Sequence, residues 1–307
     1  MKLRAKSSIK RREVYPRAVV DGHEVPDNAL YRLRSRIASM LVSRGEREEA
    51  EIEGYVRSQP GVTRPNTISV ISPKGGVGKT TNTFLVGNLL ATHLKLRTIA
   101  VDANPDFGTL AALAPDELRS ESSLADLIGN LDQVRTAAEL RPYVSQLPSG
   151  LHLLGAPADA ELMKQMTSEL YGQLLAFLAL FYEVVLLDLG TGITDPLAQF
   201  AIERADQIVV ITTPEWVTAN QVLGALEHLA HERATVVLNK ARPKSAEDRH
   251  AIEQRFREQR LHRSVTIPYD ERLQVMLDTG TYSLEALDRD TRVAVKTLGL
   301  AVAEQLV

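Results

Sequence analysis

The sequence predicts an α/β fold, with a mostly parallel twisted sheet, helices on both faces and a short N-terminal appendage. From residue 67 onward, short runs rich in Val, Ile and Leu alternate with longer segments that place apolar residues at helical spacing. Such an alternation is typical of a parallel sheet buried on both faces. The Pro and Gly residues of RSQPGVTRPN, residues 57–66, indicate a boundary before the first run. We therefore expect an appendage over residues 1–66 and a domain over residues 67–307.

The expected elements follow in order along the domain. Apolar runs typical of strands occupy residues 67–72, 97–102, 151–157, 182–190, 206–214, 233–241 and 264–270, and helical patterns occupy residues 80–94, 159–180 and 291–306. Ligands of such sheets bind outside the carboxyl ends of the strands. The polar residues that close the runs should therefore gather at one rim; they are Lys74, Asp102, Asp188, Pro214, Glu215, Asn239, Pro268 and Asp270.

The composition is that of a globular protein and excludes several classes. Of the 307 residues, 44% are hydrophobic and 24% are charged, which is sufficient for a sizeable core. There is no cysteine, so a disulfide framework and a thiolate metal site are excluded. No run approaches the roughly 18 apolar residues of a membrane span. The basic N-terminus is not followed by the apolar segment of a signal peptide, and we expect a cytoplasmic protein.

A glycine-rich loop lies between the first strand and the first helix of the domain. The segment ISPKGGVGKTTN, residues 71–82, has the spacing of a phosphate-binding loop, except that Pro73 stands where the strict pattern requires glycine. The glycines let successive backbone N–H groups turn toward an anion, and the helix N-terminus adds its dipole. Lys79 is then expected to reach the β- and γ-phosphates, and the Thr80 hydroxyl to bind Mg²⁺. A second lysine, Lys74, is not explained by this pattern.

The segment KGGVGKTT, Lys74 to Thr81, resembles the deviant Walker A motif of the ParA/MinD family of P-loop ATPases. The resemblance extends over residues 67–307. It implies that ATP and Mg²⁺ are bound, with the nucleotide held by Gly75, Gly76, Val77, Gly78, Lys79, Thr80 and Thr81. In that family the signature lysine, here Lys74, crosses a dimer interface and touches the phosphates of the partner's ATP. The resemblance thus implies a homodimer in the ATP state, in which Lys74 stabilises charge on the transferring phosphoryl group.

Two further segments resemble the family's switch regions. DANPDFGT, residues 102–109, begins with Asp102, but Asn104 stands where relatives commonly have the carboxylate that orients the attacking water. An amide is a poorer proton acceptor than a carboxylate, and Asp106 could replace it. The spacing leaves open whether Asn104 or Asp106 orients the water. In LLDLGTG, residues 186–192, the resemblance implies that Asp188 holds Mg²⁺ and that Gly190 approaches the γ-phosphate; the alternative for Asp188 is a helix cap.

The base-binding residues are expected at the ends of the last two strands. Relatives place an asparagine on the adenine edge where this chain has Asn239, and IPYD, with Pro268, resembles the loop that flanks the base. An amide can pair with adenine, although a strand-terminal turn would explain the same residues. The segment Thr213 to Glu215 matches a family element at the subunit interface, and the sequence assigns Glu215 no role.

The charge distribution and two amphipathic segments bear on partners. Residues 1–66 carry 14 Lys and Arg against nine Asp and Glu, a net +5, and leave −8 for the rest of the chain. The basic tail over residues 1–17 and the basic helix expected within 240–263 are either solvated or contacts for non-specific DNA. The helix expected over 27–43 either binds a protein partner or packs onto its own domain. The final helix has the pattern of a core helix rather than of a C-terminal membrane anchor.

These observations lead to one primary hypothesis with two rivals. The primary hypothesis is an ATP-dependent dimerising ATPase switch, slow and stimulated by a partner, that positions or segregates DNA or a large cellular assembly and associates with the nucleoid. One alternative is an ATP-sensing adaptor or regulator of a secretion, pilus or flagellar machine with little hydrolysis. The other is a metabolic or metallocentre enzyme on the same fold, which the lack of cysteine and of a second catalytic domain disfavours.

Overall fold

The computed structural model describes residues 19–20, 23–24, 49–52, 54, 61–104, 108–191, 195–226, 229, 233–242 and 246–307. The chain divides into two compact units, residues 1–47 and 48–307. In the first unit, β1 (Val19–Val20) pairs antiparallel with β2 (His23–Glu24). The basic tail and the helix expected over 27–43 lie outside the described residues, and the domain boundary expected at residue 66 stays a prediction.

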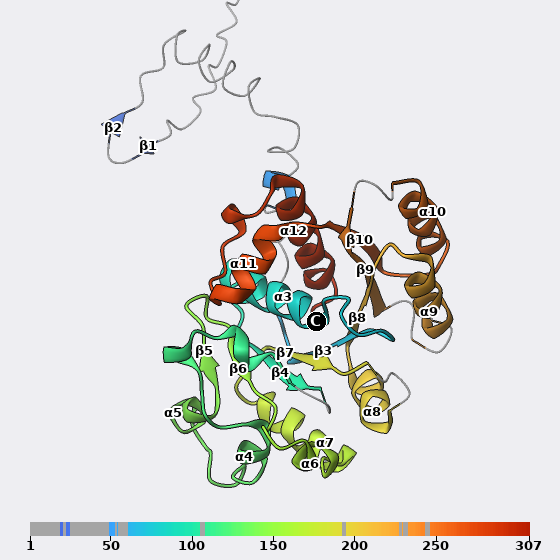
Figure 1. Cartoon of the computed structure of the whole chain (residues 1–307). Helices are drawn as coiled ribbons and strands as arrows, with labels where there is room; N and C mark the ends of the chain where they lie inside the picture. The colour runs from blue at the N-terminus through green and yellow to red at the C-terminus, as the bar shows by residue number, and fades with distance from the viewer. Residues whose placement is uncertain are drawn as a thin grey trace, which may run out of the picture. The chain divides into compact units, whose positions relative to one another are not determined.

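The second unit is built on an eight-stranded sheet with the order β10-β9-β8-β3-β7-β4-β6-β5 (Figure 1). Neighbouring strands are parallel except at one edge, where β5 runs antiparallel to β6. The predicted α/β class with a mostly parallel sheet is confirmed. The strands are β3 (Asn66–Ile71), β4 (Thr98–Ala103), β5 (Ser145–Gln146), β6 (His152–Leu154), β7 (Val184–Leu189), β8 (Gln207–Thr212), β9 (Ala234–Ala241) and β10 (Arg263–Pro268).

Helices cover both faces of this sheet, as Figure 1 shows. The α-helices are α3 (Lys79–His93), α4 (Leu124–Ile128), α5 (Ala137–Leu140), α6 (Ala160–Lys164), α7 (Ser168–Leu178), α8 (Pro196–Arg204), α9 (Trp216–Leu226), α10 (Ala246–Arg257), α11 (Glu271–Thr279) and α12 (Arg289–Ala303). Short 3₁₀ turns occupy Ala111–Leu113, Asp116–Leu118, Arg141–Tyr143 and Leu284–Ala286.

Two apolar clusters form the core, one on each face of the sheet. The first joins the strands to α7, α8, α9 and α10, and the second joins them to α3, α11 and α12. The described strands β4, β7 and β8 are buried along their whole length. Because both faces of each strand are covered, the middle of each strand is a run of apolar residues instead of an alternation, which is the pattern that predicted them.

The structure corrects one expected helix. The pattern over residues 159–180 predicts a continuous helix, but α6 ends at Lys164 and α7 begins at Ser168. The break occurs because Thr167 is extended (φ −87°, ψ 163°) and its side chain accepts a hydrogen bond from the backbone N–H of Leu170. Threonine at this position caps a new helix and so competes with continuation of the first one. Helix α10 is likewise shorter than the basic segment over 240–263.

Residues near the start of the second unit contact the C-terminal helix. The Glu49 carboxylate accepts hydrogen bonds from the Arg292 Nε (2.6 Å) and from the Lys296 Nζ (2.5 Å) of α12. Lys296 is only 5% exposed, so its charge is neutralised by a residue that lies far away in the sequence. Helix α12 in turn packs on α3, where a Cβ added to Gly299 would lie 2.4 Å from Leu89. The helix that follows the phosphate loop is therefore in close contact with the C-terminal helix.

Candidate functional site

The candidate site begins with the loop between β3 and α3. Gly76 and Gly78 have φ values of 74° and 99°, in the left-handed region that side chains disfavour. A Cβ on Gly78 would lie 2.3 Å from the Asn239 side-chain nitrogen, so this position requires glycine twice over. Gly78 is also the N-cap of α3, and no side chain caps the first turn. The free backbone N–H groups of that turn are the donors that bind a phosphate at a helix N-terminus.

Asp188 lies against the first turn of α3. Its Oδ2 accepts a hydrogen bond from the Thr80 hydroxyl at 2.6 Å, and its Oδ1 accepts one from the Thr83 hydroxyl at 3.2 Å. Burial raises the pKa of Asp188 to about 7; the Thr80 hydrogen bond opposes this rise, and the negative charge of Asp102 adds to it. Burial also lowers the pKa of Lys79, against the effect of the Asp188 charge. A buried carboxylate, a hydroxyl and a lysine are therefore brought together at the phosphate loop.

Asp102 lies beside Asp188 on the neighbouring strand, where the two Cα atoms are register partners. It is 1% exposed, and its carboxylate accepts hydrogen bonds from the backbone N–H groups of Asn104 (3.3 Å) and Leu110 (2.9 Å). Burial raises the pKa of Asp102, although both of these bonds oppose the shift. Asp102 thus anchors the segment that follows β4. Asn104 is half-buried, and Asp106 lies outside the described residues.

Lys74 lies at the outer side of the loop and turns toward its own chain. Its Nζ donates a hydrogen bond to the Thr218 hydroxyl at 2.9 Å and lies 3.4 Å from the Glu215 carboxylate. The Lys74 side chain remains 43% exposed. The segment Thr213 to Glu215, which the sequence associates with a subunit interface, thus provides the residue that pairs with Lys74.

The end of β9 holds the phosphate loop from the other side. The Asn239 amide donates to the Val77 carbonyl at 2.8 Å, and the Lys240 Nζ donates to the Gly76 carbonyl at 2.8 Å. Asn239 is 3% exposed. Because its amide nitrogen donates to Val77, its amide oxygen is the atom that could accept a hydrogen bond from an adenine amino group. Lys240 has a φ of 59°, a left-handed conformation that is uncommon outside glycine. These contacts therefore hold the end of β9 and the phosphate loop in place against each other.

The other expected base-flanking residues lie at the neighbouring strand end. Pro268 of β10 is the register partner of Ala241. Tyr269 is 44% exposed, and the Arg242 guanidinium carbon lies 4.3 Å from the centre of its ring. Asp270 instead caps α11, accepting from the Arg272 N–H at 3.0 Å, and it also accepts from the Asp288 N–H. Asp270 therefore has a structural role as the cap of α11.

The sequence did not single out three residues that contact the expected site: Thr83, Thr218 and Lys240. Thr83 follows Thr80 by three residues, so the helical period alone places both hydroxyls on one face of α3. No comparable local signal marks Thr218, which meets Lys74 only through the fold. Gly190 directly follows β7 and is buried, and residues 192–194 after it lie outside the described residues.

The residues of this site fit a magnesium nucleotide. Mg²⁺ is commonly held by one or two protein oxygens together with phosphates and water, and Thr80 and Asp188 offer such oxygens 2.6 Å apart. The raised pKa values of Asp188 and Asp102 reflect carboxylates that a divalent cation would neutralise. Within the described part of the chain, no group of three or more His, Cys, Asp or Glu residues could hold a metal by itself. The phosphates would therefore have to supply the remaining ligands.

Comparison with known proteins decides the family. Residues 68–281 match the family model described as the CobQ/CobB/MinD/ParA nucleotide binding domain. The chain belongs to this family. The sequence resemblance to the ParA and MinD P-loop ATPases is thereby confirmed, and nucleotide binding is the property that the family model describes.

Individual relatives differ in what they are named for. The chain is 28% identical over 275 residues to the ESX-1 secretion-associated protein EspI of Mycobacterium tuberculosis; the match covers 86% of this chain but only 40% of EspI. The ParA family ATPase of Chlorobium tepidum has a similar structure, with a TM-score of 0.64, 24% identity and coverage of 76% of this chain and 98% of that one. The septum site-determining protein MinD of Pyrococcus horikoshii, complexed with Mg-ADP, has a TM-score of 0.57 at 19% identity, with coverage of 77% and 94%. These two structures support the fold alone.

Helices α10 and α12, which the sequence analysis considered as candidates for DNA and membrane contact, each bury an apolar face. On α10, Ile252 and Phe256 are 1% and 0% exposed, so these two residues, four apart, form the buried face of this helix. Helix α12 buries Val295, Leu298 and Val302 in the core, as the pattern predicts. A search of the described residues finds no helix that combines the length and the apolar character needed to cross a membrane.

Proposed function

We propose that this chain is an ATP-dependent dimerising ATPase, in which Lys74 of each subunit reaches the nucleotide of the other. The observation that carries the proposal is the position of Lys74. It follows the buried strand β3 at the phosphate loop, yet its ammonium group contacts Thr218 and Glu215, and its side chain is 43% exposed. Lys79, by contrast, is the first residue of α3 and is partly buried near the Asp188 charge.

The contacts of Lys74 are compatible with its release to a second subunit. The pair with Glu215 is solvent-exposed, at 43% and 66% of the two side chains, and its Nζ–O distance is 3.4 Å. Exposed ion pairs of this kind contribute only about 0–1 kcal/mol. A phosphate from a partner subunit provides a stronger, charge-assisted acceptor. The exchange of Glu215 for a phosphate is thus favourable, and it gives ATP binding a direct effect on association.

An exposed aromatic residue beside Glu215 supports a protein contact at this place. Trp216 is 38% exposed and Val217 is 69% exposed at the start of α9. The indole Nε1 donates to the Asp248 carboxylate at 3.1 Å, and the Arg255 guanidinium carbon lies 5.5 Å from the ring centre. Because these contacts hold the ring in place, little side-chain entropy is lost when it is covered. Rigid tryptophans are enriched among the residues that dominate protein interfaces.

The proposal is tested by sedimentation velocity of the full chain with Mg-ATP, with Mg-ADP and without nucleotide. We expect a dimer only with ATP. Lys79→Ala should remain monomeric because it fails to bind nucleotide. Lys74→Ala should bind ATP yet dimerise at least about tenfold more weakly, since a hydrogen bond to a charged group contributes roughly 1.5–3 kcal/mol. A wild-type chain that is monomeric in ATP at all concentrations would refute the proposal.

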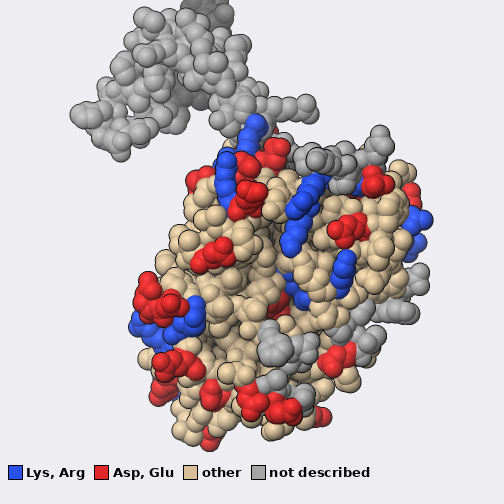
Figure 2. Space-filling view, viewed as in Figure 1, with Lys and Arg blue, Asp and Glu red and all other residues tan. Residues whose placement is uncertain are grey.

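We further propose that the dimer positions or segregates DNA or a large assembly, in the cytoplasm and at the nucleoid. The supporting feature for DNA is the basic residues of α10, but two of them are partly neutralised. The Arg249 Nε lies 3.7 Å, and an Arg257 nitrogen 3.3 Å, from the Glu253 carboxylate. Figure 2 shows acidic and basic side chains interspersed on the visible face, without one continuous basic surface among the described residues. A DNA contact would therefore depend on presenting two copies together.

DNA binding is tested with non-specific duplex across salt, with and without ATP. Each neutralised phosphate contributes a slope of about −0.9 in log K against log salt. Changing Arg249 and Arg257 of α10, and Arg260 just after it, to Glu should abolish ATP-dependent binding if this region is the contact, whereas deletion of residues 1–17 should then only weaken it. Absence of DNA binding in ATP at low salt would reject the DNA form of the proposal.

The second candidate function is an ATP-sensing adaptor or regulator of a secretion, pilus or flagellar machine. Two observations favour it: the similarity to EspI over 86% of this chain, and Asn104 where relatives commonly have a carboxylate. An adaptor of this kind would bind ATP, hydrolyse it very slowly and contact a protein through the segment over 27–43. Measurable ATP turnover stimulated by DNA would argue against the adaptor and for the positioning function.

A further inference from the structure

A small cavity of about 190 Å³ lies between α5, the turn that follows it and the amino ends of three strands. Thr98 and His152, which line it, are the first residues of β4 and β6, and Tyr182 lies just before β7. The candidate nucleotide site is at the carboxyl ends of these parallel strands, so the cavity lies at the opposite edge of the sheet. Sites for drug-sized ligands measure roughly 300–1,000 Å³, so this one suits a smaller molecule.

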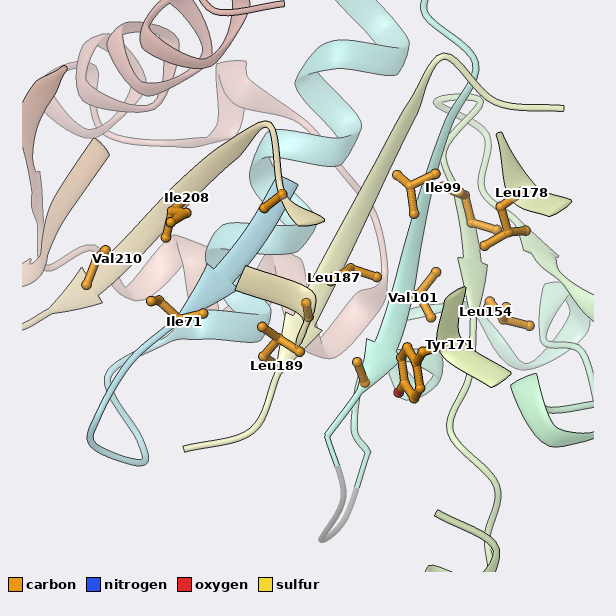
Figure 3. Packing of buried hydrophobic residues seen from close by; sticks show 14 of the residues in the cluster. Ile71, Ile99, Val101, Leu154, Tyr171, Leu178, Leu187, Leu189, Ile208 and Val210 are labelled. Atoms are coloured by element: carbon orange, nitrogen blue, oxygen red, sulfur yellow. The ribbon is translucent and has the colours of Figure 1, made fainter. Parts of the chain in front are cut away.

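The ring of His152 faces this cavity. Strand β6 pairs with β4 on one side and with β5 on the other, so its backbone is covered at both edges. His152 is on the same face of β6 as Leu154, which Figure 3 shows packed in the core beside Val101 and Tyr171. Because His152 is only partly buried and lines the cavity, its ring provides the exposed part.

His152 and Tyr182 form a hydrogen-bonded pair in the wall of the cavity. The His152 Nδ1 lies 2.7 Å from the Tyr182 hydroxyl, and the two rings meet edge to face with their centres 5.5 Å apart. Burial, and then the positive charge of Arg141, lower the pKa of His152 from 6.5, so the ring is neutral at pH 7. A neutral imidazole and a phenol carry two polar hydrogens, and their mutual bond uses one. In either tautomer, the pair has one hydrogen left to donate.

The charged residues of the lining are all basic. Arg97 and Arg141 line the cavity, and no carboxylate does so in the part of the chain that the structure describes. Arg97 is partly neutralised, since its Nε lies 3.5 Å from the Glu183 carboxylate. Arg141 is exposed and forms no ion pair with a described residue. The cavity therefore favours an anion, with Arg141 as its counter-ion.

The remaining walls are apolar. Leu140 and Val144 are 2% and 5% exposed, and Phe181 packs against the same core cluster. Together with His152 and Tyr182, Phe181 gives the cavity three aromatic rings, which favour edge-to-face contact with another ring. Inorganic phosphate would leave these walls uncovered, whereas a carboxylate on an aromatic body would cover them and still reach the basic residues.

A larger hollow on the other side of the same turn lacks this chemistry. It measures about 610 Å³ and shares Arg141 with the cavity, but Glu117 also lines it. Its second arginine, Arg119, pairs with Asp116 at 2.9 Å and donates to the Ala114 carbonyl at 2.8 Å. The charge of Arg119 is thus already satisfied within the chain.

We propose that the 190 Å³ cavity binds a small organic carboxylate with an aromatic body, held by Arg141 and by the hydrogen that the His152–Tyr182 pair has left to donate. The site lies at the opposite edge of the sheet from the phosphate loop. The proposal is therefore independent of the proposed ATPase function.

The test titrates the full chain with 4-fluorobenzoate and with 4-fluorobenzamide, which has the same shape without the charge, and follows both by fluorine NMR. For probes of this size we expect dissociation constants of roughly millimolar order. Fluorobenzoate should bind at least about tenfold more tightly than fluorobenzamide, the effect of a hydrogen bond between charged groups.

Arg141→Met should lose at least about tenfold in affinity for fluorobenzoate and keep its affinity for fluorobenzamide. The matched control is Arg135→Met, because Arg135 is an exposed arginine just before α5 that does not line the cavity. Its affinities for both probes should equal those of the wild type. Both variants change exposed residues, so their unfolding temperatures should stay close to that of the wild type.

The NMR titration of the His152 ring, assigned with His152→Asn, locates the bound probe. Fluorobenzoate should raise the pKa of His152, because a negative charge beside the ring favours the imidazolium form. Fluorobenzamide should not, since the other groups that face the ring, Arg97, Arg141 and Tyr182, are the same in both titrations.

Three results would overturn the inference. A wild-type chain that does not bind fluorobenzoate, or that binds both probes equally, shows that the cavity does not select a carboxylate. An Arg141→Met variant with wild-type affinity for fluorobenzoate shows that Arg141 is not the counter-ion. A pKa of His152 that stays unchanged when fluorobenzoate is bound shows that the probe binds elsewhere.

Discussion

Replacement of Glu49 by glutamine should destabilise the nucleotide-free chain, because Glu49 forms a buried ion pair with Arg292 and Lys296 of α12. Glu49 is the acceptor for Arg292 and Lys296, and the Glu49 and Lys296 side chains are only 12% and 6% exposed. Removing one partner of a buried ion pair costs about 3–5 kcal/mol, because the other charge stays buried. Since glutamine keeps an acceptor oxygen, we expect the lower end, about 3 kcal/mol.

The assay is thermal and urea unfolding of the full chain without nucleotide. For a unit of this size, 3 kcal/mol corresponds to a decrease in Tm of roughly 6–12 °C. Glu51→Gln is the matched control, because Glu51 is exposed on the same short segment and its replacement should stay within about 0.5 kcal/mol. In the double variant Glu49→Gln/Lys296→Met, the loss should be smaller than the sum of the two single losses, because the two residues contact each other.

The pKa of Glu49 predicts how the stability loss caused by Glu49→Gln changes with pH. Burial works to raise the pKa of Glu49, but the bonds from Arg292 and Lys296 outweigh it, so the pKa lies below its usual value of 4.5. A carboxyl whose folded-state pKa is depressed stabilises the fold above its unfolded-state pKa and loses this effect as pH falls. The gap between wild type and Glu49→Gln should therefore be full at pH 7 and narrow below pH 4.5. Equal Tm values for Glu49→Gln and Glu51→Gln at pH 7 would refute the reasoning.

Two other predictions concern Asn104, as the residue that orients the attacking water, and His152 of β6. Asn104→Asp should speed single-turnover hydrolysis by up to about a hundredfold, the low end of what a positioned general base contributes. An unchanged rate would show that another group orients the attacking water. Burial, and then the positive charge of Arg141, lower the pKa of His152 from 6.5, so its contribution to stability is full above pH 6.5 and is lost as pH falls below it. His152→Asn should flatten the stability profile between pH 5 and 7 in urea titrations, and an unchanged slope would contradict a buried, neutral ring.

The phosphate loop could be predicted from the sequence because its chemistry is local. Gly76 and Gly78 adopt left-handed conformations that few other residues tolerate, so the backbone requirement appears directly as a residue type. Asp188 and Asp102 could be predicted as neighbours because both close buried strands, and the carboxyl ends of parallel strands meet at one edge. The strand limits followed from continuous apolar runs, to within a few residues.

The remaining features depend on contacts between distant segments, which no local pattern encodes. Lys74 and Thr218 are 144 residues apart, and Glu49 and Lys296 are 247 residues apart. The break between α6 and α7 was missed because the apolar period continues across Thr167, while the cap that interrupts the helix is a single side-chain bond.

The central claim, that Lys74 acts on the nucleotide of a partner subunit, is tested most directly by mixing two inactive variants. Lys79→Ala retains Lys74 but should fail to bind ATP, whereas Lys74→Ala binds ATP but lacks the acting lysine. A mixed dimer contains one complete site, with ATP on the Lys74→Ala subunit and Lys74 supplied by the other. If Lys74 acts in trans, the mixture hydrolyses ATP faster than the sum of the two variants measured separately. A rate equal to that sum at every mixing ratio would contradict the claim.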